Sequence, residues 1–289
     1  MCSRPLSDRE LDERLADLVP SGVDWYPGHM AKAHRELRTR VALVNVVIEV
    51  IDARTPRSAR HPGLPAMIGN KAHLIALTKI DLANAQATQQ WVRHFHQPSR
   101  PALPIDAQRG TGVGRLLASV HRMAKRARVL VLGVPNCGKS SLINRACGRA
   151  AARVGANPGV TRTPQWLRAR NGVEFLDTPG LLWPKIEDPM QGLKLAWVDS
   201  VGEAAYDAHA VGSALAMWLM HHYPHLLYER YGITTEDTCL DPELILWRIG
   251  EKRGHRLAGA QVNTEQAART LLHDFRTGRI GRITLDNPP

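Results

Sequence analysis

Residues 133–140 read Gly-Val-Pro-Asn-Cys-Gly-Lys-Ser. They fit the pattern G-x-x-x-x-G-K-[ST], in which backbone N–H groups surround a phosphate, the lysine neutralises its oxygens and the final hydroxyl coordinates Mg²⁺. An apolar run at 129–132 leads into the loop as a buried strand, and residues 140–144 continue it as a helix. A strand-to-helix junction presents unpaired helix amides to an anion. The expected nucleotide-binding residues are Asn136, Cys137, Gly138, Lys139, Ser140 and Ser141, with Ser140 also a Mg²⁺ ligand.

A second phosphate-sensing element is expected at residues 177–180, Asp-Thr-Pro-Gly, which follow an apolar strand at 173–176. Asp177 at the end of that strand can hold Mg²⁺ through water, and the Gly180 N–H can meet a terminal phosphate. Aspartate at the end of a strand often only forms a turn, so the phosphate loop upstream supports this assignment.

The tetrad Thr78-Lys79-Ile80-Asp81 follows a strand predicted at 74–77 and fits a guanine-reading motif. The Asp81 carboxylate would accept hydrogen bonds from two ring N–H groups, and the Lys79 chain would pack on the base. The first position is usually Asn, so Thr78 predicts weaker or less selective binding. Asp106-Ala107-Gln108, after the strand predicted at 102–105, is a loose match to a backbone element that touches guanine.

Strands and helices alternate up to about residue 190, which predicts an α/β domain with a mostly parallel sheet covered on both faces. Guanine-reading elements precede phosphate-reading elements, which is a circular permutation of the usual GTPase order. From about Gln191 only helical periodicity remains, with helices predicted at 201–222, 242–249 and 264–275. The expected domains are therefore a permuted GTPase domain at 1–190 and a small all-helical domain at 191–289.

The 38 Lys and Arg residues against 27 Asp and Glu give a net charge of +11, which favours a polyanionic partner such as nucleic acid. The longest apolar run, at 41–51, is too short to cross a bilayer. The first twenty residues contain no apolar core, which predicts a cytoplasmic protein without a targeting peptide. The four cysteines show no spacing typical of metal ligands and are interpreted as reduced thiols.

Several motifs together resemble the ribosome biogenesis GTPase A family (YlqF/RbgA type), and the resemblance spans nearly the whole chain. They are the stretches at 25–33 (Trp-Tyr-Pro-Gly-His-Met-Ala-Lys-Ala), 52–56 (Asp-Ala-Arg-Thr-Pro), 133–136 (Gly-Val-Pro-Asn), 158–161 (Pro-Gly-Val-Thr), 177–185 (Asp-Thr-Pro-Gly-Leu-Leu-Trp-Pro-Lys) and 250–254 (Gly-Glu-Lys-Arg-Gly). The resemblance implies GTP hydrolysis stimulated by the ribosomal subunit. It also implies a carboxyl-terminal domain that binds ribosomal RNA and a role in late maturation of the large subunit.

The resemblance also assigns roles to single residues. Thr161 would sense Mg²⁺ and the γ-phosphate, and Asn136 would help to hold K⁺ beside the phosphates. Leu181 stands where a water-orienting Gln is common, and the resemblance makes His29 the catalytic residue instead.

Two other readings stay open at this stage. The chain could be a permuted GTPase that serves the small subunit or another RNA particle. It could also be an RNA-binding module in which a degenerate guanine site makes the nucleotide merely structural. The basic residues Arg248, Lys252, Arg253 and Arg256 are expected to contact rRNA phosphates.

Overall fold

The computed structural model describes residues 6–18, 37–148, 165–169, 171–178, 186, 188–238 and 240–289. The chain forms two compact units, a sheet unit of Tyr26–Lys185 with Arg282–Pro289 and a helical unit of Met1–Trp25 with Ile186–Gly281. The division between Lys185 and Ile186 lies close to the boundary expected near residue 190, and each end of the chain joins the unit that is distant from it in sequence. None of the helices in the described ranges is long and apolar enough to span a membrane.

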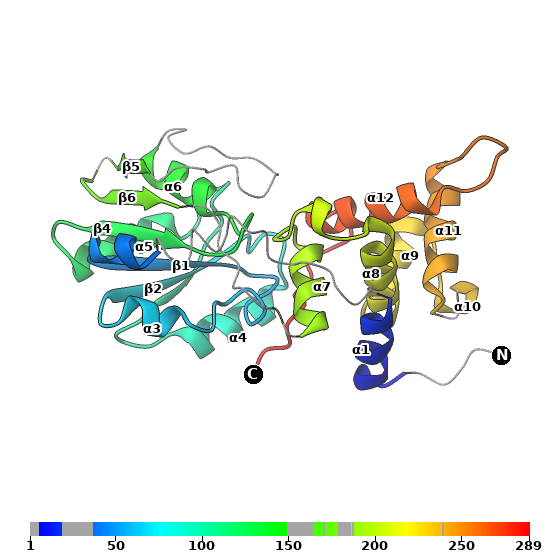
Figure 1. The fold of residues 1–289 in the computed structure, drawn as a ribbon, viewed down its shortest axis with the longest axis horizontal. Coiled ribbons are helices and arrows are strands. Elements are labelled where there is room, and N and C mark those ends of the chain that lie inside the picture. Colours follow the sequence, from blue (N-terminus) through cyan, green and yellow to red (C-terminus); the bar gives the residue numbers. More distant parts are fainter. Residues whose placement is uncertain are drawn as a thin grey trace. The chain divides into compact units, whose positions relative to one another are not determined.

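The sheet unit is built on six strands in the spatial order β3-β2-β1-β4-β6-β5 (Figure 1). All neighbouring strands pair in parallel except β5, which runs antiparallel to β6 at one edge. The loops after the parallel strands therefore meet at one edge of the sheet, as the predicted α/β fold requires. The strands are β1 (Val46–Asp52), β2 (Ala72–Thr78), β3 (Ala102–Pro104), β4 (Arg128–Leu132), β5 (Gln165–Arg168) and β6 (Glu174–Asp177).

Helices and apolar side chains cover this sheet. Residues 37–42 are helical, and together with α3 (Leu64–Ile68) they pack on β1, β4 and β6 through a buried cluster. The α4 helix (Ala85–Phe95) packs on β2 and β3, and α5 (Val113–Met123) packs on β2 and on α6 (Lys139–Cys147). The buried cluster consists of Leu37, Val41, Val44, Val47, Leu64, Ile68, Leu130, Leu132 and Leu176.

The carboxyl-terminal segment 282–289 returns to the sheet unit and contains no helix. Its Asp286 carboxylate accepts hydrogen bonds from the backbone N–H groups of Arg57 and Ser58, both at 2.8 Å, and from the Ser58 hydroxyl at 2.7 Å. The Leu285 N–H donates to the Arg54 carbonyl at 2.7 Å. Asp286 is only 2% exposed, so the segment is an integral part of the sheet unit and holds the chain that follows β1.

The helical unit is organised around α8 (Ala208–His222), whose residues from Val211 to Met220 are all buried. The predicted helix at 201–222 begins later, at Ala208, because the Asp207 carboxylate caps the N–H groups of His209 and Ala210. Gly212 allows a close approach of α12, since a Cβ there would lie 2.6 Å from the Ala268 Cβ. The other helices are α1 (Asp8–Asp17), α7 (Pro189–Trp197), η1 (Glu203–Ala205), α9 (Pro224–Tyr231), α10 (Thr235–Thr238), α11 (Pro242–Arg253) and α12 (Thr264–Arg276).

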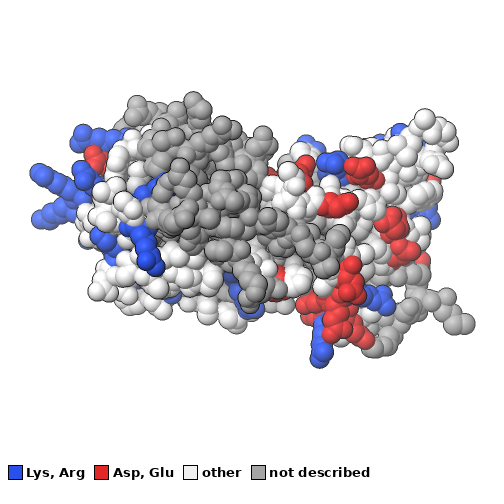
Figure 2. All heavy atoms as spheres, viewed as in Figure 1, with Lys and Arg blue, Asp and Glu red and all other residues white. Residues whose placement is uncertain are grey.

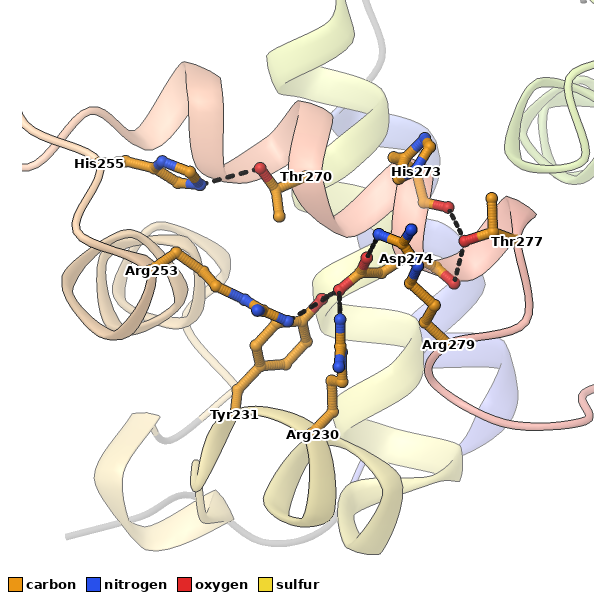
Figure 3. Close-up of polar contacts among 9 residues, drawn as sticks. All are labelled: Arg230, Tyr231, Arg253, His255, Thr270, His273, Asp274, Thr277 and Arg279. Atoms are coloured by element: carbon orange, nitrogen blue, oxygen red, sulfur yellow. Dashed lines mark hydrogen bonds and ion pairs between the residues drawn. The ribbon is translucent and has the colours of Figure 1, made fainter.

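One buried carboxylate joins three elements of the helical unit (Figure 3). Asp274 of α12 accepts hydrogen bonds from Arg230 at 2.7 and 2.9 Å, from the Tyr231 hydroxyl at 3.0 Å and from Arg253 at 3.0 Å. Arg279, just beyond α12, donates to its other oxygen at 3.3 Å. Burial alone would raise the pKa of Asp274, but Arg230 and the neighbouring donors lower it. The Arg253 side chain, expected to contact RNA, therefore also ties α11 to α12.

Candidate nucleotide-binding site

The phosphate loop lies between β4 and α6, where the sequence predicts it. Asn136 has φ 55° and Gly138 has φ 100°, both in the left-handed region, so the backbone turns sharply enough to direct successive N–H groups inward. Gly133 has no room for a side chain, because a Cβ there would collide with the Val50 carbonyl of β1. The loop conformation therefore depends on these glycines.

The Lys139 ammonium lies inside the loop rather than in solvent. It donates to the Val134 carbonyl at 2.8 Å and to the Gly133 carbonyl at 3.2 Å, and the residue is 6% exposed. Lys139 is also the first residue of α6, where the helix dipole favours an anion. The loop thus combines a fixed cation with unpaired helix amides, the pair of features that binds a phosphate.

Thr78 connects the guanine-reading tetrad to the phosphate loop. Its hydroxyl donates to the Cys137 carbonyl within the loop and lies 3.1 Å from the Ile51 carbonyl of β1. Thr78 is 1% exposed, and its Cβ faces the glycine turn at Gly138, where an added Cβ would lie 3.5 Å away. The sequence identifies Thr78 as a departure from Asn but gives no indication that its hydroxyl bridges the two motifs.

A buried ion-pair network lies directly beside the tetrad. Arg54 binds Asp52 with both ends of its guanidinium, at 3.0 and 2.8 Å, and Lys79 Nζ lies 3.1 Å from the same carboxylate. Burial would raise the pKa of Asp52, but Arg54 and Lys79 together hold it well below its usual range. Lys79 itself has φ 54°, a left-handed conformation rare outside glycine. Asp52 and Arg54 thus position Lys79, a role that sequence reasoning missed although their motif was recognised.

The remaining residues that the sequence predicts to read guanine lie at the same edge of the sheet. No described side chain pairs with the half-buried Asp81 carboxylate, which remains able to accept from a ligand. Asp106 closes its own turn by accepting from the N–H groups of Gln108 and Arg109, both at 2.9 Å, so its side chain has a structural role. The Ala107 carbonyl accepts from Arg145 of α6 at 2.9 Å, which ties this turn to the phosphate-loop helix.

Two of the expected Mg²⁺ ligands come from neighbouring elements. Asp177 ends β6, which pairs with the phosphate-loop strand β4, and it is fully buried. The Thr178 hydroxyl that follows donates to the Val131 carbonyl of β4 at 2.7 Å and fixes this end of the strand. Ser140 is the second residue of α6. Hydroxyl and carboxylate oxygens are hard ligands, so this donor set fits Mg²⁺.

Three expected site residues lie outside the residues that the structure describes, namely His29, Thr161 and Gly180. Cys137, by contrast, is well placed in the loop and fully buried. Burial raises the pKa of its thiol, which argues against a redox-sensing thiolate.

Comparison with known proteins agrees with this geometry. Residues 128–219 match a family model described as 50S ribosome-binding GTPase. The chain is 35% identical to Ribosome biogenesis GTPase A of Priestia megaterium over 92% of this chain and 97% of that protein. It is 39% identical to the Thermotoga maritima protein of the same name, over 92% and 95%. The crystal structure of GNP-bound YlqF from T. maritima aligns with a TM-score of 0.66 at 28% identity, covering 89% of this chain and 98% of that one. With its guanine-reading loops preceding its phosphate loop on one sheet, the chain belongs to the ribosome biogenesis GTPase A family.

Proposed function

We propose that this protein is a cytoplasmic, GTP-hydrolysing assembly factor for late maturation of the large ribosomal subunit. The observation that carries the proposal is the hydroxyl of Thr78, which joins a guanine-reading tetrad to a phosphate loop within one site. Family membership supports GTP hydrolysis, and the net charge of +11 supports an RNA partner.

Each residue of the site has a distinct task in this proposal. The loop amides and Lys139 bind the phosphates, while Asp81 reads guanine beside a Lys79 that Asp52 holds in place. Ser140 and Asp177, with Thr161, would hold Mg²⁺, which when bound offsets the negative charge on the phosphate oxygens. Asn136 is the proposed K⁺ ligand. Gly180 would meet the γ-phosphate.

His29 is the proposed catalytic residue, because Leu181 cannot hydrogen-bond the attacking water. Phosphoryl transfer depends mainly on positioning and charge stabilisation, and an imidazole can accept a hydrogen bond from water near neutral pH. In our proposal the ribosomal particle completes this arrangement. Turnover is then slow for the protein alone and faster with the subunit.

The GTP-bound form is proposed to bind the precursor particle and the GDP-bound form to leave it. A difference in affinity of this kind requires contacts that differ between the two states. The helical unit is the proposed rRNA-binding part, and it offers the exposed Lys252 and Arg256 and the half-buried Arg248.

Co-sedimentation with separated ribosomal subunits tests the proposal directly. We expect the protein to sediment with the large subunit or its precursor in the presence of a GTP analogue, and less with GDP. Preference for the small subunit, or equal binding with both nucleotides, would contradict it.

Guanine reading can be tested in the same assay with Asp81→Asn. An amide can donate to the exocyclic oxygen at position 2 of xanthine but offers one acceptor less to guanine. We expect this variant to lose GTP-dependent sedimentation and to regain it with a xanthosine triphosphate analogue. Wild-type behaviour with GTP would exclude Asp81 as the base reader.

A further inference from the structure

The edge strand β5 carries an exposed tryptophan among basic side chains. Trp166 of β5 is 44% exposed, and the Arg128 guanidinium lies 5.5 Å from the centroid of its ring. Figure 2 shows Lys and Arg side chains gathered at the end of the sheet unit where β4 begins. Exposed indole beside exposed cations is the combination that nucleic-acid surfaces use.

Strand register places these residues together. Arg128, Glu174 and Arg168 are successive partners across β4, β6 and β5, so they form a row with about 4.8 Å between strands. Trp166 lies two residues from Arg168 on the same strand and therefore shares its face. We call Trp166, Arg128, Arg168 and the adjoining Lys125 and Arg126 the Trp166 platform.

The backbone beneath the platform is fixed. The Asn45 side chain donates to the Arg126 carbonyl at 2.9 Å and accepts from the Arg128 N–H at 2.9 Å. Two hydrogen bonds from one amide hold the chain just where β4 begins. A ligand would thus meet a surface whose backbone needs little further ordering, which favours binding.

The platform carries surplus positive charge. Arg128 is paired with Glu174 at 3.1 Å, but no described carboxylate forms an ion pair with Lys125, Arg126 or Arg168. All three of these residues are exposed. If Arg128 stacked on Trp166 only to cover the edge strand, the three further exposed cations around them would serve no purpose.

The platform is separate from the nucleotide site. Trp166 pairs with Leu176 of β6, which pairs with Leu130 of β4, so Trp166 lies two strands, about 10 Å, to the side of β4 and three residues, about 10 Å, before Gly133. A ligand on the platform is therefore distinct from the guanine nucleotide.

We propose that the Trp166 platform binds single-stranded RNA, with an unpaired base stacked on Trp166 and the flanking phosphates on its basic residues. Stacking on an indole requires the base to leave a helix, and every base offers a π-face, so the site selects unpaired loops over duplex regardless of sequence. The identity of the ligand as RNA rests on the proposed function.

The test measures binding of the full-length protein to a mixed-sequence single-stranded RNA oligonucleotide and to a duplex of equal length. Trp166→Ala should weaken single-strand binding by roughly 5- to 150-fold, the range for removal of one stacked base. Trp166→Phe keeps a ring and should recover most of it. Arg126→Gln should lower the slope of log affinity against log salt by about 0.7 for each phosphate that the protein no longer neutralises.

A second exposed tryptophan lies in the helical unit, which is itself the proposed rRNA-binding part. Trp247 is 37% exposed and has Arg248 5.5 Å from its ring centroid, so Trp247→Ala reports how much that unit contributes to single-strand affinity. We expect the loss in Trp166→Ala whatever the effect of Trp247→Ala. Thermal unfolding and GTP binding report whether each variant is folded.

The outcomes separate this proposal from the proposed function. Wild-type oligonucleotide affinity in folded Trp166→Ala overturns the platform even if the protein sediments with large subunits. If the protein sediments with no subunit but Trp166→Ala still weakens oligonucleotide binding, the proposed function fails and the platform stands.

Discussion

Replacing Thr78 with Val tests whether the link between the two nucleotide motifs matters. Valine keeps the shape of the side chain and removes only the hydroxyl, which donates to the Cys137 carbonyl in a fully buried position. Losing a buried hydrogen bond and leaving its acceptor unpaired costs about 1–2 kcal/mol. If that link holds the loop in its binding conformation, GDP and GTP affinities should both fall by about 5- to 30-fold.

The assay is titration calorimetry with GDP and with a GTP analogue, on folded protein. Thr78→Ser keeps the hydroxyl and should bind nearly as wild type. Thr78→Asn has two N–H donors, which can meet both the Cys137 and the Ile51 carbonyls, so we expect it to bind guanine nucleotides more tightly and to widen their advantage over ATP. Unchanged nucleotide affinity in folded Thr78→Val would refute the reasoning.

Three further predictions concern stability and turnover. Asp286→Ala leaves three donors without their buried carboxylate, so the unfolding free energy of the sheet unit should fall by about 3–4 kcal/mol in urea titrations, and by less in Asp286→Asn. A decrease below about 1 kcal/mol would contradict this role of Asp286. Because the folded pKa of Asp52 lies below its ordinary 3.8, its stabilisation is present above that pH and is lost as the pH falls toward the folded value. Asp52→Asn should therefore be less stable at neutral pH and show a flatter loss of stability in acid, and parallel pH profiles would argue against this. His29→Ala should lose subunit-stimulated GTP turnover while retaining GTP and subunit binding, and unchanged stimulated turnover would exclude His29 from catalysis.

Local patterns predict most of the sheet unit. The apolar run at 129–132 lies in β4, the loop after it has the expected turns, and the tetrad predicted to read guanine begins at Thr78, the last residue of β2. These features can be predicted because a buried parallel strand and a glycine-dependent turn are each specified by adjacent residues. The permuted order then places both sets of loops at one edge without further information.

Features that depend on distant partners could not be predicted. The sequence pattern places residues 282–289 in the helical domain, but Asp286 finds its partner Ser58 at a separation of 228 residues. The hydroxyl of Thr78 reaches a carbonyl 59 residues away. Hydrophobic periodicity indicates only which face of a helix or strand is buried. It therefore cannot predict hydrogen bonds between residues that are far apart in the sequence. The residues expected to sense the γ-phosphate and to catalyse, Thr161 and His29, remain predictions.

The contact between Asp286 and Ser58 also determines when the sheet unit can be completed during biosynthesis. At translation rates of about 5–20 residues per second, roughly 10–45 s pass between synthesis of Ser58 and of Asp286. During that interval the N–H groups of Arg57 and Ser58 can be satisfied only by water or by non-native partners. The hydrogen bond from the Leu285 N–H to the Arg54 carbonyl is delayed by a similar time. In a nascent chain the loop after β1 therefore lacks its final partners, and the sheet unit becomes complete only after the helical unit has been made.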